Sequence, residues 1–182
     1  MFTIRHKILN QTIEELEELD LDEFKHEFDE DIEGQIQINF DGKTIGYVND
    51  EIPLAEEWLI LWLTKLNEAI EVLNKFNYAA FYIPDTDNIW IELKGNCDFI
   101  EVCKVKLKLE NSDKSLVAKP IDEFEKYDWD GTTINKNEFV ENILQDSEVL
   151  VSEIFEINYK LMESESIKNL KKVIYINKNF NK

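Results

Sequence analysis

Few residues of this sequence carry an imidazole or a thiol, the side chains that most often act as a general base or a nucleophile beside a second catalytic group. The histidines are His6 and His26, and the cysteines are Cys97 and Cys103. Nucleophilic catalysis needs a base within hydrogen-bond reach of the nucleophile, and no spacing in the sequence indicates such a pair. Two cysteines without a CxxC spacing build neither a disulfide framework nor a zinc site by themselves. We therefore predict no catalytic residue of these types and no cofactor.

The glycines and the acidic turns do not match ligand-binding motifs either. The five glycines form neither a dinucleotide-binding GxGxxG nor a Walker loop. Two turns, Asp85–Asn88 and Asp128–Gly131, carry acids as calcium loops do. The first lacks Gly at loop position six, and the second has Gly at position four and Phe139 at position twelve. We predict turns without a metal ion. A hydrolase with a carboxylate pair stays an alternative, although the sequence selects no pair.

The net charge is the strongest signal in the composition. There are 39 Asp and Glu against 20 Lys and Arg, which gives −19. Such a chain repels nucleic acid and anionic membranes and attracts basic partners. The start has no apolar signal-peptide core, and the longest apolar run, Trp58–Leu63, falls far short of the roughly 20 residues of a membrane helix. We predict a cytoplasmic protein that binds neither nucleic acid nor membranes.

More than half of the net charge lies in residues 11–33, the acidic segment, which holds 12 acidic residues and one Lys. Three interpretations are open. The segment is a solvated face, as charge runs usually are. It is an internal partner for the stripe of Lys104, Lys106 and Lys108. Or it is a docking surface for a basic protein, because acidic side chains around apolar anchors combine steering with affinity.

Apolar residues at helical spacing within the acidic segment favour docking. Leu21, Phe24 and Phe28 interrupt the acidic run and predict one or two short helices. The candidate partner-binding residues are Asp20, Asp22, Glu23, Phe24, Glu27, Phe28, Asp29, Glu30 and Asp31.

Alternating apolar residues predict the strands that surround this segment. Phe2–Ile8 is expected to be a half-buried strand with His6 on its apolar face, in the core or hydrogen-bonded. Residues 36–47 are expected to form a hairpin around Asp41-Gly42, a pair that tolerates the positive φ of a tight turn. Strands at 79–83, 89–94 and 99–109 predict a meander.

Helical spacing predicts a central helix around Leu54–Phe76, with Pro53 in its first turn, and a second long helix at about 136–163. A short helix is expected at 166–170 and a last strand at Val173–Ile176. Residues 110–119 are expected to be a polar loop, and 120–135 irregular. The predicted class is α+β: an antiparallel sheet, made of the hairpin and the meander, packed by the central helix and a long C-terminal helix. We expect one domain over 1–182 without an internal boundary.

The order of these elements over about residues 1–109 resembles a known family. It consists of the strand FTIRHKI leading into an acidic stretch, the hairpin INFDGKTIGYVNDE, the helix LAEEWLILWLTKLNEAIEVLNKF and the strands FYIPDTDNIWIELKGNCDFIEV. This pattern resembles the small immunity proteins of bacterial polymorphic toxin systems. The resemblance implies a non-enzymatic cytoplasmic protein that binds and neutralises a cognate toxin domain, often a basic nuclease. Residues 110–182 lie outside it.

Charge and resemblance therefore agree on a protein-binding module that is not an enzyme and whose partner is a basic protein. Two other classes stay open beside it. One is an acidic mimic of nucleic acid that inhibits a DNA-binding protein, and the other is the small hydrolase with a carboxylate pair.

Overall fold

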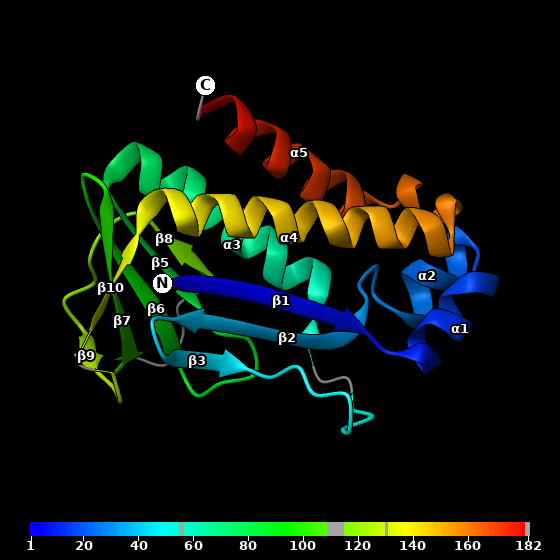
Figure 1. Cartoon of the computed structure of the whole chain (residues 1–182), viewed down its shortest axis with the longest axis horizontal. Coiled ribbons are helices and arrows are strands. Elements are labelled where there is room, and N and C mark those ends of the chain that lie inside the picture. The colour runs from blue at the N-terminus through cyan, green and yellow to red at the C-terminus, as the bar shows by residue number, and fades with distance from the viewer. Residues whose placement is uncertain (55–56, 109–114, 130, 181–182) are drawn as a thin grey trace. The chain divides into compact units, whose positions relative to one another are not determined.

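A computed structural model of the chain describes residues 1–54, 57–108, 115–129 and 131–180. It has the predicted α+β class, with antiparallel sheets and a long helix in the C-terminal part (Figure 1). In chain order the elements are β1 (Phe2–Ile8), α1 (Asn10–Glu18), α2 (Leu21–Glu27), β2 (Glu33–Phe40), β3 (Lys43–Gly46), β4 (Glu57–Trp58), α3 (Leu59–Phe76), β5 (Tyr78–Tyr82), β6 (Ile89–Asn96), β7 (Phe99–Leu107), β8 (Leu116–Val117), β9 (Phe124–Lys126), β10 (Thr132–Asn135), α4 (Lys136–Ile157), the 3-10 helix η1 (Tyr159–Glu163) and α5 (Glu165–Phe180).

The chain forms two compact units, each assembled from separate segments. The meander unit consists of Met1–Thr3, Asn39–Lys43 and Glu68–Glu141. The acidic unit consists of Ile4–Ile38, Thr44–Asn67 and Asn142–Lys182. The division does not follow the order of the chain, because several elements contribute residues to both units: β1, β2, β3, α3 and α4. The single domain expected over 1–182 stays a prediction.

The meander unit contains the six-stranded sheet, ordered β10-β7-β6-β5-β8 with β9 also paired to β7. Its three central strands confirm the predicted meander, although Leu109 lies outside the described residues. Trp90 and Ile91 are adjacent on β6 and both are buried, so both faces of this strand are covered. Of the expected loop at 110–119, residues 110–114 lie outside the described residues. The rest corrects the expectation, because Leu116–Val117 forms the short strand β8 against β5.

Short strands correct the expectation of irregular structure at 120–135. Thr132–Asn135 pairs with Ile100 and its neighbours on β7, and Phe124–Lys126 pairs with the other end of β7. These strands are only three and four residues long and partly exposed, so they show little of the alternation that marks a longer strand.

The acidic unit contains most of the other sheet, ordered β1-β2-β3 with β4 paired to β2, and the predicted first strand and hairpin are confirmed. Gly34 on β2 allows close packing there. A Cβ atom at this position would lie 2.5 Å from Leu59 Cδ1 and 2.7 Å from the carbonyl oxygen of Lys7. A larger residue would therefore push β2 away from the start of α3.

The central helix α3 begins at Leu59, later than the predicted start near Leu54. Residues 57–58 instead form β4 against Glu33 and Gly34, while Glu56 lies outside the described residues. The buried face is as predicted, since Trp62 and Leu66 are at most 1% exposed.

The C-terminal part differs most from the prediction. The helix α4 ends at Ile157, because Asn158 adopts extended backbone and accepts a hydrogen bond from the Lys160 amide at the start of η1. The strand predicted at Val173–Ile176 is wrong, since these residues lie inside α5. Ile167, Leu170 and Ile174 are buried at helical spacing, and the short run VIYI alone does not distinguish helix from strand.

Candidate functional site

An open groove between two short helices brings together part of the acidic segment. Figure 1 labels these helices as α1 and α2. Its volume is about 580 Å³. The lining side chains are four acids and two apolar residues, and they define what we name the acidic groove: Glu15, Glu18, Leu19, Glu23, Glu27 and Phe28. The lining contains no basic residue among those described. This combination suits a cationic side chain with an aliphatic stem, as in Lys or Arg.

Two sets of hydrogen bonds hold the walls of the acidic groove. Asp20 begins α2 with a capping box: its carboxylate accepts from the amides of Asp22 and Glu23, both at 2.9 Å, and the Glu23 carboxylate accepts from the Asp20 amide at 3.0 Å. The end of α1 is fixed by Asn158, whose amide group donates to the carbonyl of Leu16 at 2.9 Å and of Leu19 at 2.8 Å. Hydrogen bonds therefore fix the backbone at the end of α1 and at the start of α2, on both sides of the groove.

The predicted partner-binding residues separate into surface and core positions. Asp20, Asp22, Glu23, Glu27 and Asp29 are exposed, as docking requires.

The two predicted aromatic anchors differ in how deeply they are buried. Phe28 is half-buried and lines the acidic groove. Phe24 is completely buried and stacks on Phe28 with ring centroids 6.3 Å apart. Phe24 therefore belongs to the core, which corrects its assignment as an anchor that faces a partner. Phe28 alone offers an aromatic surface in the groove.

Glu30 and Asp31 form hydrogen bonds that stabilise the fold. The backbone amide of Ser166 donates to the Glu30 carboxylate at 3.3 Å, and the Ser166 hydroxyl donates to the Glu30 carbonyl. Asp31 accepts from the amides of Ile60 and Leu61, both at 2.8 Å, and so caps the start of α3.

Burial also changes the pKa of Asp31, the residue that caps α3. Burial raises the pKa of the Asp31 carboxyl to about 6, although the backbone amide bonds act in the opposite direction. Asp31 is therefore a structural residue of the acidic unit, and we remove it and Glu30 from the candidate site.

Three lining residues, Glu15, Glu18 and Leu19, were not among the predicted site residues. A signal for the two glutamates exists in the sequence, because residues three apart on a helix lie on the same face. Glu18 also lies in the last turn of α1, which carries no basic residue. A carboxylate there faces the negative end of the helix dipole and is locally unfavourable. Such local disagreement with helix chemistry is typical of functional positions.

The lysine stripe on β7 has partners close by in the meander unit. Lys104 pairs with Asp128 at 3.3 Å, Lys106 with Asp87 at 2.5 Å, and Lys108 with Glu125 at 2.5 Å. The interpretation of the acidic segment as an internal partner of this stripe is therefore wrong. The solvated face and the docking surface stay as the two interpretations.

His6 forms a second cluster of titratable groups, apart from the acidic groove. Its side chain is 2% exposed. Nδ1 lies 2.9 Å from a carboxylate oxygen of Asp146, and Nε2 lies 2.8 Å from one of Glu153. Burial lowers the pKa of His6, but the two carboxylates outweigh it and raise the pKa to about 9. The expected hydrogen-bonded histidine is confirmed, with both ring nitrogens bonded.

The remaining chemical groups add no further site. Cys97 is exposed and Cys103 is buried, and both are free thiols. Within the described ranges, no cluster of three or more His, Cys, Asp and Glu side chains is placed to hold a metal ion. None of the helices in those ranges combines the length and the apolar character that crossing a bilayer requires.

Comparison with known proteins gives no family for this chain. No family model matches it, no curated protein is detectably similar to it, and no solved structure matches its fold.

Proposed function

We propose that this chain is a non-enzymatic immunity protein that binds a basic cognate toxin domain and neutralises it. The observation that carries the proposal is the acidic groove, which four glutamates line together with Leu19 and Phe28. It lies between two short helices, and the second of them begins with a capping box. The resemblance of residues 1–109 to immunity proteins of polymorphic toxin systems supports the same conclusion.

The chemistry of the groove indicates how such a partner binds. An Arg or Lys side chain of the partner places its charge between Glu15, Glu18, Glu23 and Glu27, and its stem contacts Phe28. The net charge of −19 attracts a basic domain from a distance and aligns it before contact. Contact excludes the partner's own anionic substrate from the same basic residues, which is how neutralisation follows from binding.

The first test uses the protein encoded immediately upstream of this chain's gene, co-purified with the chain and assayed for a toxic activity. The expected result is a stable complex in which that activity is lost at one chain per toxin domain. The triple variant E15Q/E18Q/E27Q should weaken binding and restore activity. Glu23 is left unchanged because it belongs to the capping box of α2.

A matched control separates the groove from net charge. D122N/E123Q/E141Q removes three exposed acids of the meander unit and changes the net charge by the same amount. It should bind and neutralise like the unchanged chain. Equal weakening by both triple variants would assign binding to overall charge, and no weakening by the groove variant would refute the proposed site.

A further inference from the structure

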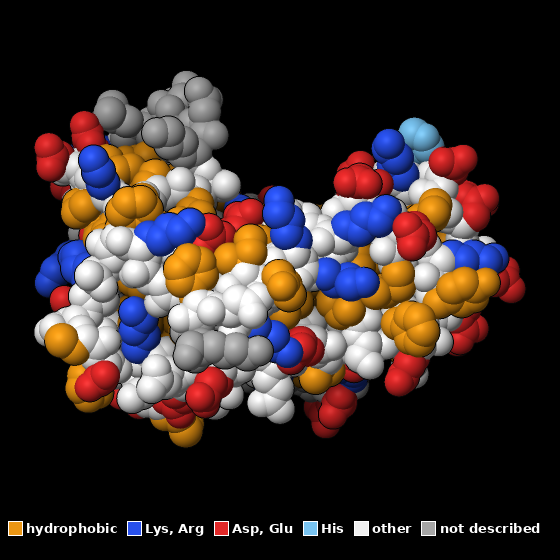
Figure 2. All heavy atoms as spheres, turned by 90° about the horizontal axis from the view of Figure 1, so that it is seen from above, with side chains coloured by type: hydrophobic (Ala, Val, Ile, Leu, Met, Phe, Trp, Pro, Cys, Tyr) orange, Lys and Arg blue, Asp and Glu red, His pale blue; other side chains and the backbone are white. Residues whose placement is uncertain are grey.

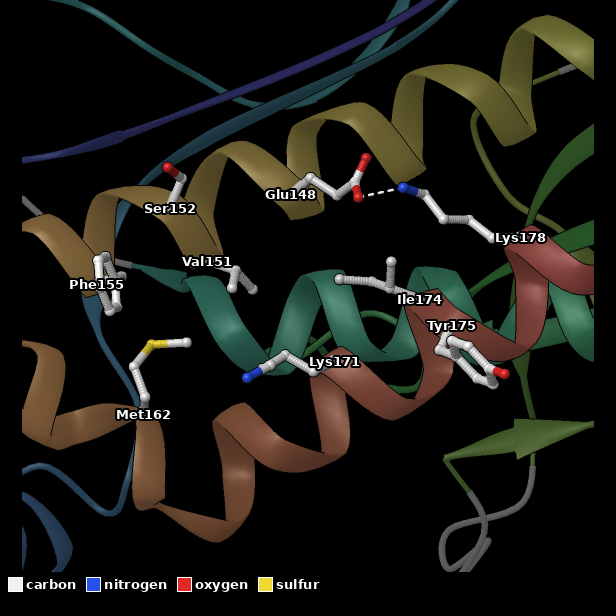
Figure 3. Close-up of a pocket in the computed structure, with 9 residues that line it drawn as sticks. All are labelled: Glu148, Val151, Ser152, Phe155, Met162, Lys171, Ile174, Tyr175 and Lys178. Atoms are coloured by element: carbon white, nitrogen blue, oxygen red, sulfur yellow. Dashed lines mark hydrogen bonds and ion pairs between the residues drawn. The ribbon is translucent and has the colours of Figure 1, made fainter.

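A second groove, between α4 and α5, has the opposite character to the acidic groove. Its volume is about 480 Å³, and most of its lining is apolar. Val151 and Phe155 from α4, Met162 from η1, and Ile174 and Tyr175 from α5 line it (Figure 3). Phe155 is 58% exposed and Tyr175 is 70% exposed. Two helices thus hold large aromatic side chains in water along one open groove.

Basic residues border this apolar groove although the chain as a whole is acidic. The helix α5 holds four Lys and one Glu. Lys168 pairs with Glu163 and Lys178 pairs with Glu148, the second pair being visible in the close-up (Figure 3). Lys171 and Lys172 form no ion pair with any residue that the structure describes.

Figure 2 looks onto this side of the molecule and shows basic and apolar side chains next to one another over α5. Unpaired lysines beside exposed aromatic residues, in a chain with about twice as many acids as bases, indicate an acidic occupant.

We propose that the occupant is a second copy of this chain, and that α5 of one copy docks into the acidic groove of the other. The face of α5 and the acidic groove complement each other in charge and in the combination of charged with apolar groups. Lys171 and Lys172 supply ammonium groups on long aliphatic stems, which is what the glutamates around Leu19 and Phe28 accept. Leu21, 38% exposed at the start of α2, supplies an apolar side chain for the groove beside α5.

This docking has a consequence for the acidic groove. Both surfaces belong to the acidic unit, so each copy carries one donor and one acceptor surface. Two reciprocal contacts close a dimer, and single contacts extend into longer assemblies. A basic partner that fills the acidic groove displaces α5 of the second copy, so partner binding and self-association exclude each other.

Sedimentation velocity of the full chain at tens of micromolar and physiological salt tests the inference. At this ionic strength the Debye length is about 8 Å, so long-range repulsion between acidic copies is screened while contacts between grooves persist. The unchanged chain should sediment as a dimer or larger species. K171E/K172E and E18K/E27K should each sediment as monomers. Their equimolar mixture should associate again, because one contact between the two variants is reversed in sign, the other is unchanged, and both are complementary.

The control K119E/K126E changes two exposed lysines of the meander unit and should associate like the unchanged chain. Circular dichroism shows whether each variant is folded. A monomeric unchanged chain would overturn the inference and would assign the basic face to another, acidic protein. Association of either reversed variant alone, or a mixture that stays monomeric, would overturn it as well. The readout needs no toxin domain, so its failure is distinct from failure of the proposed function.

Discussion

The ion cluster around His6 predicts that the protein loses stability as the pH rises above neutrality. A neutral imidazole has one donor and one acceptor nitrogen, whereas both nitrogens of His6 lie on carboxylate oxygens. The geometry therefore fits the imidazolium form. The pKa of His6 rises from 6.5 to about 9 because burial, which lowers it, is outweighed by Asp146 and Glu153.

The sign of the effect follows from linkage. A folded-state pKa above the unfolded-state pKa means that the native protein binds the extra proton, so the stabilisation is complete below pH 6.5 and is lost as the pH rises through 9. A shift of this size corresponds to at most about 3 kcal/mol in the free energy of unfolding. The value is an upper bound, because the Glu153 side chain is 45% exposed and solvent screens its charge.

The assay is urea unfolding followed by tryptophan fluorescence at several pH values between 6.5 and 9.5. His6→Gln removes the titrating group, so the difference between the two proteins should shrink as the pH rises. His26→Gln is the matched control, since His26 is exposed, and it should follow the unchanged chain at every pH. Parallel curves for the unchanged chain and His6→Gln would refute the charged cluster.

Three further predictions concern the core, the cap of α3 and the acidic groove. Leu66→Ala should lower the free energy of unfolding by about 2–5 kcal/mol, because Leu66 is completely buried, and urea unfolding measures it. Asp31 has a folded-state pKa of about 6, above its ordinary 3.8, so the protein should gain stability as the pH falls between these values, and Asp31→Asn should remove this gain. Glu18→Gln should raise the free energy of unfolding by about 0.3–1 kcal/mol, because it removes a carboxylate from the negative end of α1, while weakening partner binding. A loss of stability in this variant would contradict the assignment of Glu18 to function.

The sequence predicts the elements whose burial repeats with a clear period. Phe2–Ile8 alternates, and the helix up to Phe76 carries a wide apolar stripe, so both are confirmed in type. The start of α3 was misplaced because its cap, Asp31, comes from a distant part of the chain and not from the residues just before the helix. The strand expected at Val173–Ile176 was wrong because four apolar residues in a row are compatible with either period.

The candidate site is less predictable than the fold. The sequence shows that the acidic segment is unusual, but not which of its side chains face water. Phe24 and Phe28 look equivalent in sequence, and only the packing of α2 buries the first and leaves the second in the groove. The groove itself depends on Asn158, which bonds to Leu16 from 142 residues away. No local pattern encodes a contact of that range.

The most direct test of the proposed docking site is the association rate with the proposed partner, the protein encoded immediately upstream, at two salt concentrations, measured by surface plasmon resonance. Electrostatic steering raises association rates by roughly 10–10³-fold and fades with salt. E15Q/E18Q/E27Q should therefore associate more slowly and with a flatter salt dependence, whereas D122N/E123Q/E141Q should follow the unchanged chain. An association rate of the groove variant equal to that of the unchanged chain at both salt concentrations would contradict docking at the acidic groove and leave the acidic segment as a solvated face.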